Sequence, residues 1–170
     1  MKIEQVLVLI KPDGVKKSLV GNILSRLSSL NAIIVASKVL KVNKELAEKH
    51  YDGIKNKPFF DETVNSLQGN FYEEPWHRVI AFIYQGENLI SNIRELVGFA
   101  NPEKANSNSI RGSYGRITSE GIFETVIHCS SSSYEAEREI KLWFNPYEIV
   151  NVIYPVIKKK IKEKEELCWL

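Results

Sequence analysis

Residues 122–131, Ile-Phe-Glu-Thr-Val-Ile-His-Cys-Ser-Ser, join a short apolar run to one histidine and a serine-rich segment. The run from Ile122 to Ile127 predicts a strand that delivers His128 at its end. Ser132 and Glu135 have the spacing of a capping box, so a helix is expected to begin there. A histidine between a strand and a helix start lies where backbone N–H groups and the helix dipole can hold anionic oxygens.

Further elements are predicted on the N-terminal side of this segment. Runs rich in apolar or β-branched residues indicate strands at Val6–Ile10, Ile33–Leu40 and Val79–Tyr84. Apolar residues at helical spacing indicate helices at Val20–Leu30, Asn43–His50, Glu62–Leu67, Asn88–Val97 and Ser132–Phe144. Turn chemistry is expected at Lys11–Gly14 and a loop at Asn101–Tyr114. This order predicts an α/β (α+β) protein with a ferredoxin-like, four-stranded antiparallel sheet and helices packed on one face.

Length and composition exclude several classes of protein. The chain has 170 residues, enough for one domain with a proper core, and it is 44% hydrophobic and 26% charged. A net charge of +2 provides no strong field for nucleic acid or a membrane surface. Cys129 and Cys168 form neither a disulfide framework nor a zinc spacing. The first apolar run, Val6–Ile10, is too short for a signal peptide or a membrane span, and a cytoplasmic location is expected.

Several short motifs follow one another over most of residues 5–145. They are Leu9–Val15, Leu19–Gly21, His50–Tyr51, Lys57–Phe60, Asn101–Pro102, Ser109–Gly112, Val126–His128, Glu135–Ile140 and Leu142–Phe144. In this order they resemble the nucleoside diphosphate kinase family. The resemblance implies a kinase domain over residues 1–150 with a loop insertion near 72–78, followed by a C-terminal extension over 151–170.

The resemblance implies a two-step phosphoryl transfer. A nucleoside triphosphate such as ATP would give its γ-phosphate to His128, and the phosphohistidine would pass it to a diphosphate such as GDP. Neutral imidazole is a competent nucleophile near pH 7, and a covalent intermediate divides one difficult transfer into two easier ones. The residue types in the motifs therefore suit the implied chemistry.

The resemblance also assigns roles around the histidine. Glu139 matches the carboxylate that orients the imidazole, Ser130 a serine that supports both groups, and Tyr51 a residue near the transferred phosphoryl group. Lys11, together with Arg94 on the Asn88–Val97 helix and Arg111 on the long loop, matches positions that contact phosphate. A spread negative charge in the transition state needs such cations.

Nucleotide binding by resemblance involves three further positions. Phe59 matches the aromatic residue on which the base stacks. Ala100 stands where the family has a threonine that contacts phosphate, and Thr125 where it has an asparagine near the ribose 3′-hydroxyl. Mg²⁺ would arrive on the nucleotide phosphates, and no protein metal ligand is expected. The family also implies a homo-oligomer built from dimers.

Two other functions remain open at this stage. Ala100 and Thr125 also suit a nucleotide-binding or regulatory protein of the same fold with weakened transfer. Nucleic-acid binding through the Lys158–Lys160 tail would be the third, but interleaved glutamates leave few phosphate contacts. The kinase hypothesis predicts an active enzyme that is slower or altered in sugar preference.

Overall fold

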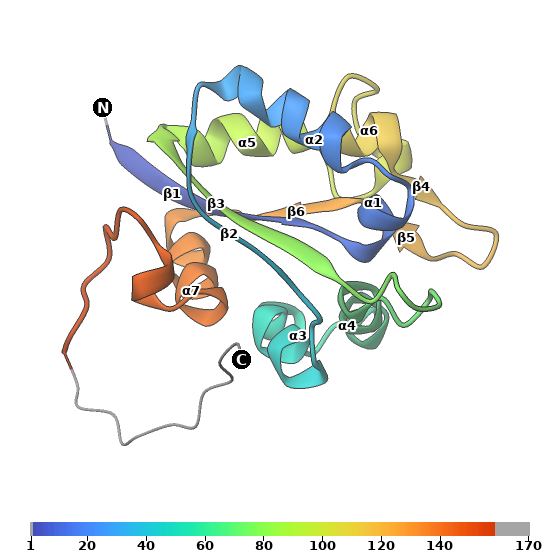
Figure 1. Ribbon diagram of the computed structural model, residues 1–170. Helices are drawn as coiled ribbons and strands as arrows, with labels where there is room; N and C mark the ends of the chain where they lie inside the picture. The colour runs from blue at the N-terminus through green and yellow to red at the C-terminus, as the bar shows by residue number, and fades with distance from the viewer. Residues whose placement is uncertain (1, 159–170) are drawn as a thin grey trace, which may run out of the picture.

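The computed structural model describes residues 2–158, and its centre is a four-stranded antiparallel sheet (Figure 1). The strands are β1 (Ile3–Ile10), β2 (Ile33–Leu40), β3 (Val79–Glu87) and β6 (Ile127–Cys129). Their spatial order is β2-β3-β1-β6, and every neighbouring pair is antiparallel. The predicted ferredoxin-like sheet is therefore confirmed. Cys168 and the charged tail beyond Lys158 lie outside the described residues.

Helices cover both faces of the sheet, so the prediction of helices on one face was wrong. In Figure 1, α2 (Val20–Leu27), α5 (Leu89–Val97) and α6 (Ile110–Tyr114) lie above the sheet. On the opposite face lie α3 (Lys44–His50), α4 (Phe60–Gln68) and α7 (Ser133–Trp143). On this face α7 packs against the central strand β1.

The sequence of β1 explains why two helical layers are needed. Val6, Val8 and Ile10 belong to the core beneath α2 and α5, whereas Leu7 and Leu9 belong to the core beneath α3, α4 and α7. All five side chains are fully buried. A strand that is apolar on both faces must be covered on both faces, and each buried aliphatic side chain contributes about 1.5–3 kcal/mol.

The predicted helix starts are confirmed at two caps. The Asn43 side-chain oxygen accepts a hydrogen bond from the Leu46 N–H at 2.8 Å, and α3 follows it. The Ser132 hydroxyl accepts from the Glu135 N–H at 3.2 Å at the start of α7. These bonds satisfy backbone donors that the first helical turn leaves without partners.

Two segments predicted to be irregular contain short helices instead. The Lys11–Gly14 segment leads into α1 (Pro12–Lys16), in which Pro12 occupies the first helical position. The Asn101–Tyr114 segment contains η3 (Pro102–Lys104) as well as α6, and Ser109 caps α6 by accepting from the Gly112 N–H. Proline at a helix start and serine at an N-cap favour these short helices locally. The remaining 3-10 turns are η1 (Ser28–Leu30), η2 (Asp52–Ile54) and η4 (Pro146–Glu148).

The strand predicted at Ile122–Ile127 is broken into two. Phe123–Glu124 forms β5 and pairs with β4 (Arg116–Ile117), whereas β6 begins only at Ile127. Between them Val126 has a φ of +56°, a left-handed conformation that is unfavourable for a β-branched residue. His128 therefore lies within β6 and not after a continuous strand.

In residues 2–158, none of the helices has the length and apolar character needed to cross a membrane.

Candidate active site

His128 is held by the sheet on one side and by α7 on the other. Within β6 it pairs with Leu9 of the central strand β1. Its side chain is 18% exposed, so one edge of the imidazole reaches solvent. A nucleophile in this position has a rigid backbone and an accessible ring.

Glu139 of α7 binds the inner edge of this imidazole. Its Oε1 lies 3.1 Å from His128 Nε2, and its Oε2 accepts a hydrogen bond of 2.6 Å from the Ser130 hydroxyl. Ser130 in turn accepts from the Leu7 N–H at 3.2 Å, which ties the group to β1. Burial alone would raise the pKa of Glu139, but His128, His50 and Ser130 lower it to about 2.

The ionised Glu139 decides which nitrogen of His128 can attack. A carboxylate only accepts hydrogen bonds, so the proton of the neutral ring is placed on Nε2. Nδ1 then keeps its lone pair on the opposite edge of the ring. The geometry thus provides an imidazole nucleophile with a negative charge behind it.

His50 lies next to this pair and is fully buried. The Trp143 indole N–H donates to His50 Nδ1 at 3.1 Å, and the rings of His50 and His128 meet edge to face at 4.4 Å. Burial, followed by the charge of His128, holds the pKa of His50 well below its usual value. His50 is therefore neutral and does not compete with His128 for the Glu139 charge, although Arg138 Nη2 also lies 3.9 Å from Glu139 Oε1.

Lys11 and Thr125 meet on the nucleophile's side of β1. Lys11 follows the last residue of β1 and is buried, and its Nζ donates to Thr125 Oγ1 at 3.0 Å. Burial lowers the pKa of Lys11, while the nearby Asp13 carboxylate opposes that change. A lysine with one neutral partner keeps two donors for an anionic ligand.

Arg111 is fixed by backbone carbonyl groups. Its guanidinium donates to the carbonyl oxygens of Gly98 and Ile127, each at 3.0 Å. Arg111 lies on α6 and not on a loop, so its backbone is also fixed. Burial lowers its pKa, but an arginine remains charged at any physiological pH.

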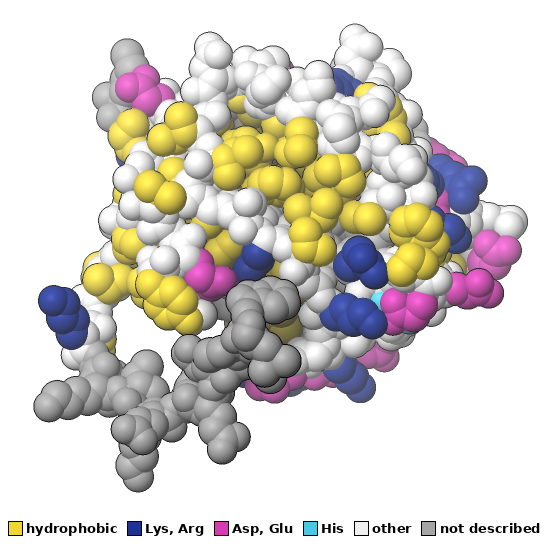
Figure 2. Space-filling model, in the orientation of Figure 1, with side chains coloured by type: hydrophobic (Ala, Val, Ile, Leu, Met, Phe, Trp, Pro, Cys, Tyr) yellow, Lys and Arg dark blue, Asp and Glu magenta, His cyan; other side chains and the backbone are white. Residues whose placement is uncertain are grey.

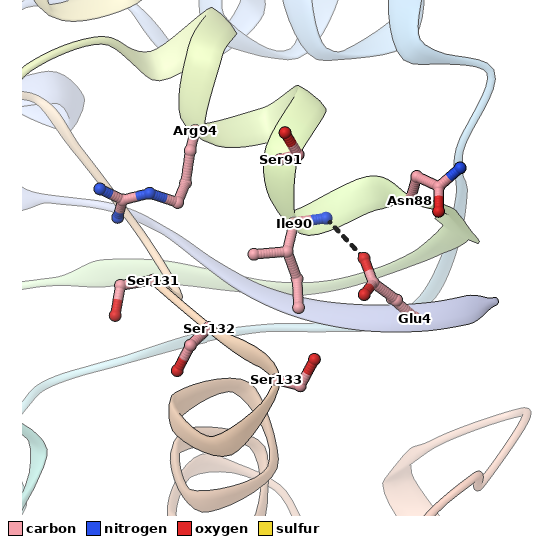
Figure 3. Close-up of a pocket in the computed structure, with 8 residues that line it drawn as sticks. All are labelled: Glu4, Asn88, Ile90, Ser91, Arg94, Ser131, Ser132 and Ser133. Atoms are coloured by element: carbon pink, nitrogen blue, oxygen red, sulfur yellow. Dashed lines mark hydrogen bonds between the residues drawn. The ribbon is translucent and has the colours of Figure 1, made fainter.

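Arg94 lies on α5 and borders a groove of about 450 Å³. Figure 3 shows its side chain extending from α5 on the same side as Ser131, while Asn88 and Glu4 lie at the other end. Ser131–Ser133, which lead into α7, line the opposite wall. Arg94 is exposed, in contrast to Arg111.

Of Tyr51, Phe59 and Ala100, the structure shows only Tyr51 next to His128. The Tyr51 ring meets the His128 ring edge to face at 6.3 Å, and burial raises the pKa of Tyr51, so it remains a neutral donor. Phe59 is half exposed before α4, and Ala100 is exposed after α5. Among residues 2–158 neither of these two has a hydrogen bond or ring contact with His128, and their roles stay predictions.

A buried carboxylate beside Thr125 escaped the sequence analysis. Glu124 contacts Lys17 and Arg116, each at 2.6 Å, and accepts from the Tyr72 hydroxyl at 2.8 Å. Burial would raise the pKa of Glu124, but the hydrogen bonds from these three side chains lower it to about 2. The cluster fixes the backbone next to Thr125. A glutamate in a strand pattern gives no signal that it will be buried.

One group of side chains has the atom types of a metal site. Nitrogen atoms of His50 and His128 and an oxygen of Glu139 lie within 4.8 Å of one another. These atoms already bind each other or Trp143, so the group is a hydrogen-bonded network. The cationic Lys11 and Arg111, which donate to Thr125 and Ile127 next to His128, also disfavour a bare metal cation at this position.

Comparisons with known proteins agree with this geometry. The family model described as "Nucleoside diphosphate kinase" matches residues 4–149. A nucleoside diphosphate kinase of Desulfitobacterium hafniense is 39% identical over 146 residues, covering 86% of this chain and 91% of that protein. The solved enzyme of Halobacterium salinarum in complex with CDP has a TM-score of 0.77 and 32% identity, covering 90% of this chain and 95% of that one. A Borrelia burgdorferi enzyme, solved as a transition-state mimic with vanadate and ADP, has a TM-score of 0.77 and 29% identity, covering 89% and 93%.

Proposed function

The chain belongs to the nucleoside diphosphate kinase family, and we propose that it transfers the γ-phosphate of a nucleoside triphosphate to a nucleoside diphosphate through His128. The observation that carries the assignment of the nucleophile is the contact of 3.1 Å between His128 Nε2 and the buried Glu139. It leaves Nδ1 as the free nucleophilic nitrogen.

In the first half-reaction the Nδ1 lone pair attacks the γ-phosphorus. A nitrogen–phosphorus bond forms as the bond to the β,γ-bridging oxygen breaks, and the nucleoside diphosphate leaves with that electron pair. The imidazole becomes positively charged, and Glu139 stabilises this charge without taking the Nε2 proton. In the second half-reaction a terminal oxygen of an acceptor diphosphate attacks the same phosphorus, and the nitrogen recovers its lone pair.

The cations and the neutral tyrosine hold the phosphoryl group in line. Lys11 and Arg111 approach from fixed positions, and Arg94 can reach the phosphates from α5. Tyr51, whose raised pKa keeps its hydroxyl protonated, donates a hydrogen bond to the moving group. These contacts are worth most when they are aimed at charge that develops in the transition state.

Mg²⁺ would be held by the nucleotide's own phosphate oxygens and would neutralise part of their charge. Both oxygens of Glu139 already bind His128 and Ser130, so this carboxylate has no free oxygen for a metal. Removing divalent cations with EDTA should stop the transfer, and added Mg²⁺ should restore it. Unchanged transfer in EDTA would contradict a role for the cation.

A homo-oligomer built from dimers is supported by the free edge of the sheet. β2 is the longer of the two edge strands, and Ile33, Ile34 and Val39 on it are 53%, 50% and 61% exposed. Figure 2 shows hydrophobic side chains gathered over the face where α2 and β2 lie in Figure 1. A long apolar edge strand is normally paired or covered. Sedimentation velocity should show a dimer or larger, and Ile34→Lys with Val39→Lys should shift it toward monomer.

The domain boundary is likewise a proposal. Among residues 2–158 the last helical turn, η4, ends at Glu148, which supports a kinase domain over residues 1–150 and an extension over 151–170. The insertion near 72–78 corresponds to a surface segment between α4 and β3. A cytoplasmic location stays a prediction.

The decisive test uses γ-labelled ATP with Mg²⁺ on the wild type and His128→Ala. The wild type should take up an acid-labile, base-stable label and pass it to unlabelled GDP, whereas His128→Ala should remain unlabelled. An unlabelled wild type that still binds ATP would instead favour the nucleotide-binding protein, with Ala100 and Thr125 as the causes. Circular dichroism of both proteins would show that each is folded.

A further inference from the structure

The backbone is distorted two residues before the nucleophile. Val126 has a φ of +56°, and the Ile127 N–H donates to the Thr125 carbonyl oxygen at 2.7 Å across it. A three-residue turn with a positive φ at its centre is a rare and strained form of γ-turn. Such a conformation persists only when its surroundings hold it, and it is found preferentially at functional sites.

The surroundings that hold this turn come from the Lys11–Gly14 segment. The Asp13 Oδ2 accepts the Val126 N–H at 2.7 Å, and the Lys11 N–H donates to the Val126 carbonyl oxygen at 3.0 Å. Gly14 packs against the same carbonyl so closely that a Cβ there would lie 2.7 Å from its oxygen. Both peptide groups of Val126 are therefore bound by one segment 113 residues away.

The chemistry of Asp13 shows that this contact is its main interaction. The residue is 1% exposed, and among the described residues its other oxygen, Oδ1, is buried with no hydrogen-bond partner. Burying a carboxylate with a single hydrogen bond is unfavourable, so a purely stabilising role would be served better by an uncharged side chain. The bond it makes is charge-assisted, and such bonds are about twice as strong as neutral ones.

The turn connects two parts of the site. On its N-terminal side Thr125 accepts the hydrogen bond of Lys11 Nζ, and on its C-terminal side His128 meets Glu139. A relaxed Val126 would rotate these two side chains relative to each other. We propose that Asp13 is a positioning residue, which holds the left-handed turn at Val126 and thereby sets both Thr125 against Lys11 and His128 against Glu139. The proposal rests on the phosphotransfer proposed above.

The first test compares two substitutions of the same side chain. Asp13→Asn keeps an oxygen that can accept the Val126 N–H, whereas Asp13→Ala removes it. Because a displacement of about 1 Å can cost about a hundredfold in rate, Asp13→Ala should lower single-turnover phosphorylation of His128 at saturating ATP by about ten- to a hundredfold. The phosphorylation rate of Asp13→Asn should stay within about threefold of the wild-type rate. An Asp13→Ala rate close to wild type, or an Asp13→Asn rate as low as Asp13→Ala, would refute the role.

A second test asks whether the strain itself is what Asp13 holds. Glycine adopts a positive φ at no steric cost, so Val126→Gly should rescue the Asp13→Ala variant by about fivefold or more. If the two substitutions lower the rate independently, so that the double variant is slower than Asp13→Ala, Asp13 does not act through this turn.

A matched control separates positioning from general stability. The Glu148 carboxylate accepts the Asn145 N–H at 2.6 Å, a bond of the same kind in η4, and its side chain also pairs with Lys38 and with no residue of the proposed site. Glu148→Ala should lower the melting temperature and leave the phosphorylation rate of folded protein unchanged. If Asp13→Ala behaved in this way too, its role would be structural only.

A readout without activity keeps this proposal distinct from the proposed function. Hydrogen exchange followed by NMR should show that Asp13→Ala loses protection at the Val126 amide while the β1 amides keep theirs. If Asp13→Ala left the protection of the Val126 amide unchanged, Asp13 would not hold the turn at Val126, even in an active enzyme. If the wild type took up no label from ATP but its Val126 amide was protected in a way that depends on Asp13, the phosphotransfer would be refuted. The role of Asp13 in holding the turn at Val126 would still stand.

Discussion

Replacing Glu139 by glutamine tests the centre of the proposed mechanism. The glutamine carbonyl oxygen can still accept from His128 Nε2–H, while its amide would donate to the Ser130 hydroxyl, which now donates to Glu139 Oε2. The side-chain shape is kept, and the main change at the imidazole is the loss of the negative charge behind it. The expected result is a slower phosphorylation of His128 with little change in nucleotide binding.

The magnitude follows from the contact distance. Two unit charges 3.1 Å apart interact by about 5 kcal/mol at an effective dielectric constant of about 20. The imidazole gains only part of its charge in the transition state, and the neutral hydrogen bond remains. A loss of about 1.5–3 kcal/mol, the usual value of a hydrogen bond to a charged group, is therefore expected. It corresponds to a decrease in kcat of about ten- to a hundredfold.

Quenched-flow measurement with γ-labelled ATP gives the phosphorylation rate directly, and a nucleotide titration gives the affinity. Glu137→Gln is the matched control, because Glu137 lies on the same helix and pairs with Lys141 at the surface. The control should leave both values unchanged. A Glu139→Gln rate within about twofold of wild type would show that the charge of Glu139 does not assist the transfer.

Three further predictions concern single positions. Ala100→Thr should raise kcat by about two- to tenfold, because one neutral hydrogen bond contributes about 0.5–1.5 kcal/mol; steady-state kinetics with ATP and GDP would check this, and an unchanged kcat would show that the site works without that hydroxyl. His50 stays neutral when folded but takes up a proton near pH 6.5 when unfolded, so wild-type stability should fall as the pH drops below 6.5, by up to about 1.4 kcal/mol per unit. His50→Gln, which keeps an acceptor for Trp143, should flatten that slope in urea titrations, and parallel slopes would contradict the buried neutral imidazole. The folded pKa of Glu124, about 2 against an ordinary 4.5, gives stability that is present above pH 4.5 and is lost as the pH falls toward 2; Glu124→Gln should remove up to about 3 kcal/mol of that acid-dependent loss, measured by thermal unfolding across this range.

Local sequence patterns predicted most of the fold. The β-branched runs located β2 and β3, and Asn43 and Ser132 located the starts of α3 and α7. The prediction of helices on only one face was wrong, although the continuous apolar run of β1 already indicates a strand that is buried on both faces. The break at Val126 could not be predicted from the local sequence, because the Asp13 carboxylate that accepts the Val126 N–H lies 113 positions away in sequence.

The candidate site depended more on resemblance than on pattern. Nothing in the spacing of His128 and Glu139 shows that they meet, since one lies in a strand and the other in the helix that follows it. The Trp143–His50 hydrogen bond joins residues 93 apart, and a buried histidine looks like any other in the sequence. These contacts depend on tertiary packing, which cannot be predicted from a short stretch of sequence.

The two arginines of the proposed site differ in what ligand binding would require of them. Arg111 is already immobilised by two backbone carbonyl groups, so a phosphate meets a guanidinium that has no further rotamer freedom to lose. Arg94 is exposed, and in the proposed role it would be ordered when the nucleotide binds, at an entropic cost of up to about 2 kcal/mol. The proposed site therefore combines one fixed cation, Arg111, with one mobile cation, Arg94. Heating should first weaken the contact between Arg94 and the nucleotide, because this contact carries the larger entropic cost. Nucleotide release should therefore become faster with temperature before His128 loses its alignment.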